Sequence, residues 1–255
     1  MSTLLLRFLL APLLVGAASL SARRWGNTVG GWIAALPFVA GPLLFVVTLE
    51  QGAAFAAVSA RSALSGIVAL AVFANVYARI CQKWPWWAAL PSGWTAYLLA
   101  AWAMSPWSLG IVARLVGALC ALGMARFLLP AAPQPASVAA LPDRPSWDLP
   151  ARMASAAALV GTIATLAHRL GPNWSGLLAP FPISTTILVA FTQAQEGPSA
   201  VTTMLRGFLP ALTGLTCFFA TLALLLPHLS IAATFGIGLA VTVATQAAAI
   251  RLAGK

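Results

Sequence analysis

The chain has 255 residues, of which 61% are hydrophobic and 7% are charged. Soluble domains carry about a quarter charged residues because water covers their surface, so this composition excludes a soluble protein and predicts an all-α integral membrane protein. The net charge of +10 comes from basic residues that stand singly or in pairs at the ends of apolar runs. That distribution is typical of membrane proteins with positive cytoplasmic loops and argues against a nucleic-acid partner.

Apolar runs of about 20 residues are long enough to cross a bilayer core of roughly 30 Å as helices. The sequence predicts nine such helices, at 3–22, 29–49, 53–79, 84–104, 107–128, 151–169, 174–194, 198–226 and 230–250. Residues 130–149 are rich in proline and contain Asp143, Arg144 and Asp148, so we expect an exposed linker there.

The two halves of the chain fall into register when the sequence is displaced along itself, without gaps, so that Arg7 meets Arg152. We call this displacement the repeat shift. Matches of Ala and Leu are common by chance in such a chain, but glycine-rich turns, a proline and arginines also coincide. The matched pairs are Arg7 and Arg152, Gly16 and Gly161, Arg24 and Arg169, Gly26 and Gly171, Gly31 and Gly176, Pro37 and Pro182, Gly52 and Gly197, Arg61 and Arg206, Phe73 and Phe218, and Gly93 and Gly238.

The repeat predicts a 4+1+4 arrangement in one membrane domain. Residues 1–105 form the first four-helix repeat, 106–150 a connector helix with a cytoplasmic linker, and 151–255 the second repeat. Because the first repeat and the connector make an odd number of crossings, the second repeat enters from the opposite side. This inverted topology is found in many secondary transporters.

The basic residues between the predicted helices indicate the orientation. With nine crossings, one side collects Arg23 and Arg24, Arg79 and Lys83, Arg126, Arg144 and Arg152, and Arg251 and Lys255. The positive-inside rule therefore predicts an N-terminus outside and a cytoplasmic C-terminus in a bacterial-type inner membrane.

The second helix of each half is expected to be discontinuous, because proline removes a backbone donor and obstructs a helix. Freed backbone groups within a membrane need partners in protein or in a water-filled cavity, so paired breaks indicate a substrate site. The alternative is a pair of kinks used only for packing. The residues predicted to bind substrate here are Pro37, Phe38, Pro42, Pro182, Ser184, Thr185 and Thr186.

Arg61 and Arg206 each follow the glycine that opens their helix by nine residues, or roughly 13 Å, which is close to mid-depth. A charge at that depth suggests substrate binding, unless the side chain reaches the lipid headgroups. Glu50 and Glu196 end the second helix of each half and are candidates for gating or coupling. Their alternative reading is a polar helix end closed by glycine.

No catalytic residue, metal site or cofactor is predicted, so we do not expect an enzyme. Cys81, Cys120 and Cys217 lack metal-ligand spacing and read as small core residues. His168 and His228 lack the companions that a metal or hydrolytic site needs, and no phosphate-binding loop is present.

The function favoured by these features is secondary transport of a small anionic solute by alternating access. One alternative is a flippase or scramblase for a lipid or polyprenyl carrier, which predicts a lateral opening between helices. Another is a non-transporting subunit of a membrane complex, which predicts no cavity between the repeats. The expected partners are the lipid bilayer and the solute, with an undefined coupling ion, and a homodimer is compatible with the sequence.

Overall fold

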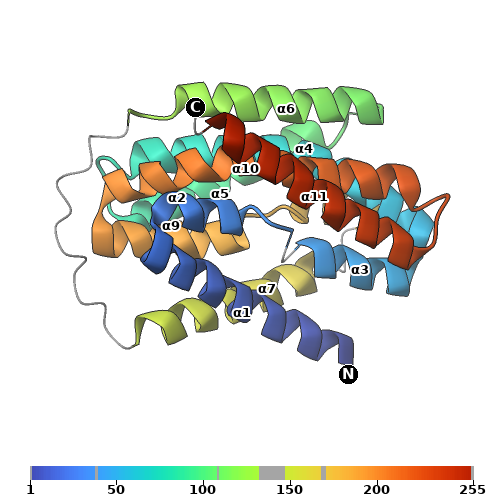
Figure 1. Cartoon of the computed structure of the whole chain (residues 1–255), viewed down its shortest axis with the longest axis horizontal. Coiled ribbons are helices and arrows are strands. Elements are labelled where there is room, and N and C mark those ends of the chain that lie inside the picture. Colours follow the sequence, from blue (N-terminus) through green and yellow to red (C-terminus); the bar gives the residue numbers. More distant parts are fainter. Residues whose placement is uncertain (1, 38–39, 108, 132–146, 168–170, 254–255) are drawn as a thin grey trace.

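A computed structural model describes residues 2–37, 40–107, 109–131, 147–167 and 171–253. Every regular element among them is a helix (Figure 1), which confirms the all-α prediction. The helices are α1 (Ser2–Trp25), α2 (Asn27–Ala34), α3 (Ala40–Gln51), α4 (Ala53–Ile80), α5 (Trp86–Met104), α6 (Ile111–Leu128), α7 (Asp148–Ala167), α8 (Gly171–Leu178), α9 (Ile183–Glu196), α10 (Pro198–Leu225) and α11 (Ile231–Ala253).

Several of these helices are long and apolar enough to cross a membrane, as expected of a multi-pass membrane protein. The five segments that qualify by length and composition are Ala53–Ile80, Ile111–Leu128, Gly176–Glu196, Pro198–Leu225 and Ile231–Ala249. The other four predicted crossings correspond to α1, α2 with α3, α5, and α7, and their passage through the bilayer stays a prediction. Residues 132–146 of the expected linker lie outside the described part of the chain.

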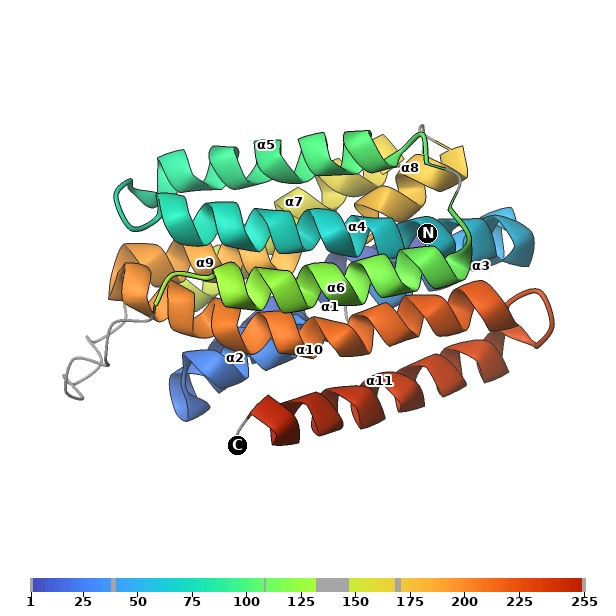
Figure 2. The ribbon, with the colours of Figure 1, turned by 90° about the horizontal axis from the view of Figure 1, so that it is seen from above.

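The helix boundaries recur along the chain at the spacing found in the sequence. Both the first and the last residue of α10 lie one repeat shift after the corresponding residues of α4, and α11 begins one repeat shift after the start of α5. Figure 2 shows α4 and α10 side by side and running in opposite directions, with α6 lying against both.

The short helices of each half pack against the long helix of the other half, because glycine allows their backbones to approach closely. Helix α2 contacts α10, and a Cβ added at Gly31 would lie 2.2 Å from the carbonyl oxygen of Met204. Helix α8 contacts α4, and a Cβ added at Gly176 would lie 2.1 Å from the carbonyl oxygen of Ser59. The two crossings therefore involve residues that are related by the repeat shift.

Helices α4 and α10 form the centre of the molecule, whereas α6 and α11 face outward. The apolar windows of α4 and α10 are 72% and 67% buried, against 17% for α6 and 28% for α11. Cys120 lies exposed on α6, so its assignment to the core was wrong: an apolar helix that faces lipid has the same composition as one in the core. Cys81 is buried as expected.

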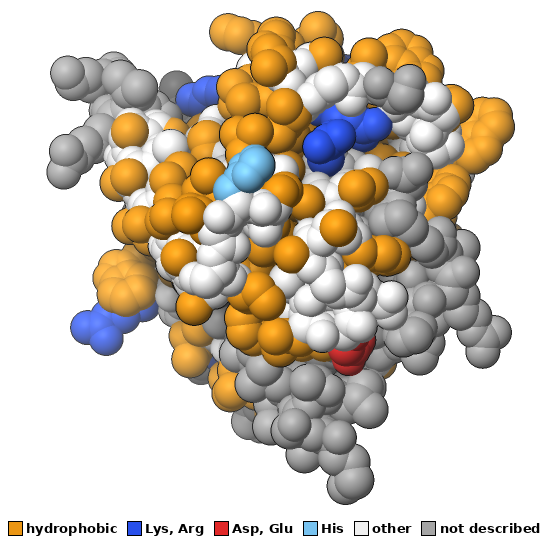
Figure 3. All heavy atoms as spheres, turned by 90° about the vertical axis from the view of Figure 1, so that its right-hand side faces the viewer, with side chains coloured by type: hydrophobic (Ala, Val, Ile, Leu, Met, Phe, Trp, Pro, Cys, Tyr) orange, Lys and Arg blue, Asp and Glu red, His pale blue; other side chains and the backbone are white. Residues whose placement is uncertain are grey.

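Single glycines separate consecutive helices where the chain reverses direction. Gly52 and Gly197 adopt φ values of 87° and 84°, a left-handed conformation that favours glycine. The glycine-closed helix ends after Glu50 and Glu196 are thus present. The end of the molecule where α10 meets α11 shows mainly hydrophobic and uncharged side chains and few charged ones on its described surface (Figure 3).

Candidate functional site

The predicted helix breaks are present at both places. Helix α2 ends at Ala34 and α3 begins at Ala40, while α8 ends at Leu178 and α9 begins at Ile183. The chain between the helices contains Pro37 at the first break and Pro182 at the second, as predicted, whereas Pro42 lies inside α3.

Backbone carbonyls at the two breaks are satisfied by buried side chains from the opposite half of the chain. Tyr97 on α5 donates a hydrogen bond of 2.6 Å to the carbonyl of Leu177. Gln246 on α11 donates a bond of 2.6 Å to the carbonyl of Trp32, and the repeat shift relates these two carbonyls. The carbonyl of Trp32 also accepts a 3.3 Å bond from the amide of Ala35. Carbonyls at helix ends lack the regular partners of the helix interior, so the bonds from Tyr97 and Gln246 help to stabilise a backbone that is costly to bury.

The two breaks meet around a small cavity of about 40 Å³. Its lining includes the last residue of α2, the first residue of α3 and the first three residues of α9, so ends of helices from both halves surround it. The side chains of α4 and α10 close its remaining walls. The lining residues are Ala34, Leu36, Ala40, Leu70, Ala179, Pro180, Phe181, Pro182, Ile183, Ser184, Thr185, Phe208, Leu212 and Leu215.

The proline and hydroxyl residues predicted to bind substrate divide between this cavity and its surroundings. Pro182, Ser184 and Thr185 line the cavity. Thr186 faces away from it, and its hydroxyl accepts a hydrogen bond of 3.0 Å from Nε1 of Trp94.

Of the residues predicted to bind substrate at the first break, Pro37 and Pro42 do not line the cavity. Pro37 is buried beside the break, and its carbonyl accepts a 2.7 Å bond from the amide of Gly41. Pro42 is half-buried in α3. Phe38 lies outside the described residues.

The two repeated arginines lie near the connector helix α6, and neither lines the cavity. Arg61 is exposed and lies close enough to Arg114 for their positive charges to repel. Arg206 is half-buried and donates a 2.9 Å hydrogen bond to the carbonyl of Pro130, while Arg126 donates one of 3.0 Å to the carbonyl of Arg206. The structure therefore does not bring the arginines together with the helix breaks.

Glu50 and Glu196 lie at the ends of α3 and α9. The carboxylate of Glu196 accepts a 2.7 Å hydrogen bond from Nδ2 of Asn27, which joins α9 to α2. Glu50 is exposed.

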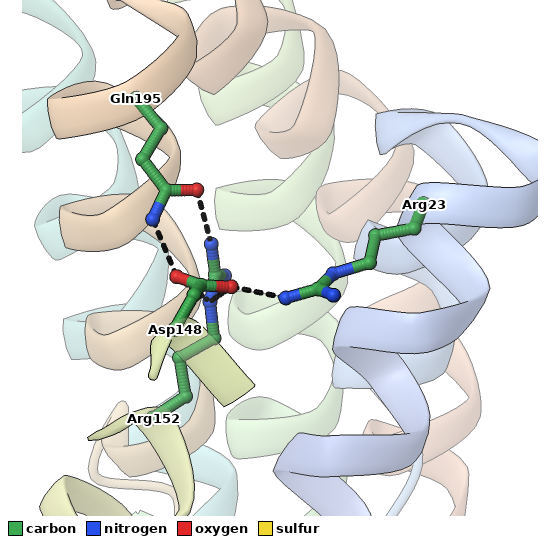
Figure 4. A network of polar contacts seen from close by, with 4 residues as sticks. All are labelled: Arg23, Asp148, Arg152 and Gln195. Atoms are coloured by element: carbon green, nitrogen blue, oxygen red, sulfur yellow. Dashed lines mark hydrogen bonds and ion pairs between the residues drawn. The ribbon is translucent and has the colours of Figure 1, made fainter. Parts of the chain in front are cut away.

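A buried polar network joins Arg23, Asp148, Arg152 and Gln195 (Figure 4), and the sequence did not predict it. The Asp148 carboxylate accepts bonds of 3.0 Å from Nε of Arg152, and further bonds from Arg23 and Gln195. Nη2 of Arg152 also donates a 3.1 Å bond to Gln195. Asp148 is fully buried and Arg152 is 2% exposed, so the network ties α1, α7 and α9 together. The spacing of Asp148 and Arg152, one helical turn apart, was its only signal in the sequence.

The environment of Asp148 favours its charged form. The residue precedes the predicted crossing at 151–169. Burial alone would raise the pKa of its carboxyl, but the hydrogen bonds from Gln195, Arg152 and Arg23 and the positive charge of Arg152 outweigh burial and lower that pKa below its ordinary value.

Other polar contacts close the same end of the molecule. The hydroxyl of Tyr77 on α4 donates a 2.7 Å bond to Oε1 of Gln193, and Nε2 of Gln193 donates one of 2.8 Å to the carbonyl of Trp84. The last turn of α9 is therefore hydrogen-bonded to α2, α4, α7 and the turn before α5, and it is linked to α1 through Asp148.

Within the described part of the chain, no group of three or more His, Cys, Asp or Glu residues could hold a metal ion. His228 is exposed, and His168 lies outside the described residues. No protein-family model matches the chain, and neither a curated protein nor a solved structure matches it.

Proposed function

We propose that this chain is a secondary transporter that moves a small solute across the membrane by alternating access. The observation that carries the proposal is the meeting of helix ends from both halves around one small cavity. Discontinuous helices that meet at the interface of two repeats form the substrate sites of several transporter architectures.

Matched contacts support an inverted repeat as the basis of this mechanism. The helix boundaries, the close crossings at Gly31 and Gly176, and the capped carbonyls of Trp32 and Leu177 all recur at the repeat shift. Two related halves that run in opposite directions can exchange conformations, and this exchange would open the site to one side and then to the other.

The helix ends at the cavity favour a small anionic solute. Ala40 and Ile183 are the first residues of α3 and α9, and helix N-termini carry a partial positive charge that stabilises anions. The hydroxyls of Ser184 and Thr185 add hydrogen-bond donors. A role for Arg61 and Arg206 in transport stays a prediction. Each arginine would serve one half of the substrate path from its position beside α6.

The polar contacts at the end of α9 are the proposed gate on one side. A cavity of about 40 Å³ is far smaller than the several hundred Å³ of ordinary ligand pockets, so a solute of ordinary size requires the helices around the site to move apart. Opening toward the end that carries Asp148 would require α9 to separate from α1, α2 and α7, which breaks the Asp148 network and the bond between Asn27 and Glu196.

The test is the solvent accessibility of single cysteines at Thr185 and Ala40, in a protein whose three native cysteines are replaced. A membrane-impermeant thiol reagent is applied from each side, with Lys83→Cys in an exposed turn as the labelling control. We expect both cavity sites to react, with the accessible side changing when candidate anions are added. If both stay unreactive from either side while the control labels, transport is wrong and the non-transporting subunit is favoured.

A second candidate, a lipid flippase or scramblase, is favoured by a large apolar groove between α5, α7 and α9 that opens sideways. A protein of this kind would exchange fluorescent lipids between the leaflets of reconstituted vesicles. The transporter proposal predicts no such exchange above that of protein-free vesicles.

A further inference from the structure

The groove between α5, α7 and α9 is an apolar cavity that the proposed transport site does not use. Its volume is about 830 Å³. Apolar side chains dominate the lining, which consists of Trp86, Leu90, Trp94, Trp147, Ser155, Ala158, Leu159, Thr162, Thr186, Ile187, Ala190, Phe191, Ala194 and Gln195. In a membrane, such a groove would be exposed to the hydrocarbon chains of the lipids.

The length of the groove matches one leaflet of a bilayer. Along α9 it extends from Thr186 to Gln195, and nine residues of helix correspond to about 13 Å. Along α5 it extends from Trp86 to Trp94, which corresponds to about 12 Å. Half of a hydrocarbon core of roughly 30 Å is about 15 Å, so the groove reaches from one membrane surface to mid-depth.

The two ends of the groove differ in polarity. At one end lie the exposed Trp86 and Trp147 together with Gln195, which is bonded to the Asp148 network. Tryptophan is enriched at the membrane–water interface. At the same end, the side chain of Gln193 donates a hydrogen bond to the carbonyl of Trp84. The exposed Lys83 precedes Trp84 in the sequence, so it lies near the position of a lipid headgroup.

The other end is closed by the hydrogen bond from Trp94 to Thr186 and by the contact of the Trp94 ring with Phe181, whose centroids are 6.0 Å apart. Phe181 and Thr185 line the transport cavity on the far side of this wall. The groove is thus separate from the transport cavity. A hydrocarbon chain that entered the groove from the membrane–water interface would end against Trp94.

We propose that this groove is a binding site for one hydrocarbon chain of a membrane lipid, with the headgroup at the Trp86, Trp147 and Gln195 end and the chain terminus against Trp94. The bound lipid would belong to one leaflet of the bilayer only, whereas a path for lipid translocation would connect both leaflets. The proposal does not depend on transport.

The experiment uses phosphatidylcholine with a photoreactive diazirine near the end of one chain, incorporated with the full-length protein into proteoliposomes. After irradiation, the labelled peptides are identified and quantified by mass spectrometry. We expect the label to concentrate on Leu90, Trp94, Thr186 and Ile187. Val112 and Val116 on the outward face of α6 report general contact with lipid.

Two variants fill the groove from its walls. Ala158 on α7 and Ala194 on α9 are exposed, so Ala158→Trp and Ala194→Trp add bulk to the groove without replacing a core residue. Ala113→Trp on the exposed face of α6 is the matched control.

We expect each groove variant to reduce labelling at Trp94 and Thr186 by about tenfold, and the control to leave it unchanged. Circular dichroism and thermal unfolding verify that each variant folds. Labelling of Trp94 and Thr186 that is no stronger than that of α6, or that survives both substitutions in folded protein, would overturn the proposal. Because no solute is present, failure here leaves the proposed transport function untouched.

Discussion

At the scale of single residues, Asp148 is the acidic side chain on which the buried contacts of α1, α7 and α9 converge. Its carboxylate is fully buried and bonded to Arg23, Arg152 and Gln195. A buried charge is tolerated only when it is paired and hydrogen-bonded, so removing the carboxylate leaves Arg152 buried without its counter-ion.

We expect Asp148→Asn to lower the free energy of unfolding by about 3–5 kcal/mol, the usual cost of breaking a buried ion pair from one side. Thermal or chemical unfolding of the purified protein in detergent measures the change. Lys83→Gln, which neutralises an exposed charge, is the control and should stay within about 0.5 kcal/mol of the parent protein. Equal losses for the two variants would contradict the role given to Asp148.

The pH dependence of stability follows from the lowered pKa of Asp148. The folded state binds its proton less readily than the unfolded chain, whose aspartates titrate near about 3.9. The stabilisation is therefore present above about pH 4 and is lost as the pH falls through the folded-state pKa. We expect the melting temperature of the parent protein to fall between about pH 4 and pH 3 more steeply than that of Asp148→Asn, and parallel curves would argue against this assignment.

At the scale of elements, the crossings of α2 with α10 and of α8 with α4 position the two helix breaks. Both depend on the absence of a side chain at Gly31 and Gly176, since an added Cβ would lie 2.2 Å and 2.1 Å from backbone oxygens. Backbone atoms in packed helices cannot move aside independently, so even alanine forces the helices apart.

We expect Gly31→Ala and Gly176→Ala each to destabilise the protein by at least about 1–3 kcal/mol, the range seen for overpacked cores, and to reduce the yield of folded protein. Gly117→Ala on α6, where an added Cβ meets no atom within 4 Å, is the matched control. It should be neutral or stabilising by up to about 1 kcal/mol. Fluorescence-detected size exclusion after heating compares the three, and a similar melting temperature for all would show that the crossings tolerate expansion.

At the scale of the whole molecule, the uneven distribution of basic residues makes the orientation testable. The last turns of α1, α4 and α6 carry Arg23 and Arg24, Arg79, and Arg126, and Lys83 follows in the turn after α4. The described surface at the end where α10 meets α11 shows few charged side chains (Figure 3).

The positive-inside rule predicts that single cysteines at Lys83 and Arg126 react with an impermeant reagent only from the cytoplasmic side. Cysteines at Leu109 and His228 should react only from the outside. Labelling in whole cells and in inverted membrane vesicles separates the two cases, and permeabilised cells show that all four sites can react. The opposite pattern would place the N-terminus in the cytoplasm.

Structural features that depend only on residues close together in the sequence could be predicted from the sequence alone. Composition and the length of apolar runs determine a multi-pass, all-helical membrane protein, because each membrane helix satisfies its backbone within its own segment. Prolines and glycines act locally on backbone geometry, so the breaks between α2 and α3 and between α8 and α9 were found at Pro37 and Pro182.

Which side of each helix faces inward was decided only by the tertiary structure. Arg61 and Arg206 lie beside α6 and not in the cavity, because the rotation of α4 and α10 is set by packing against α8 and α2. Asp148 reads as a linker residue, yet it is buried by Arg23 and Gln195, which lie 125 and 47 residues away. The cavity and the groove between α5, α7 and α9 likewise form between helices that are distant in the sequence. The spacing of such helices cannot be predicted from a local sequence pattern.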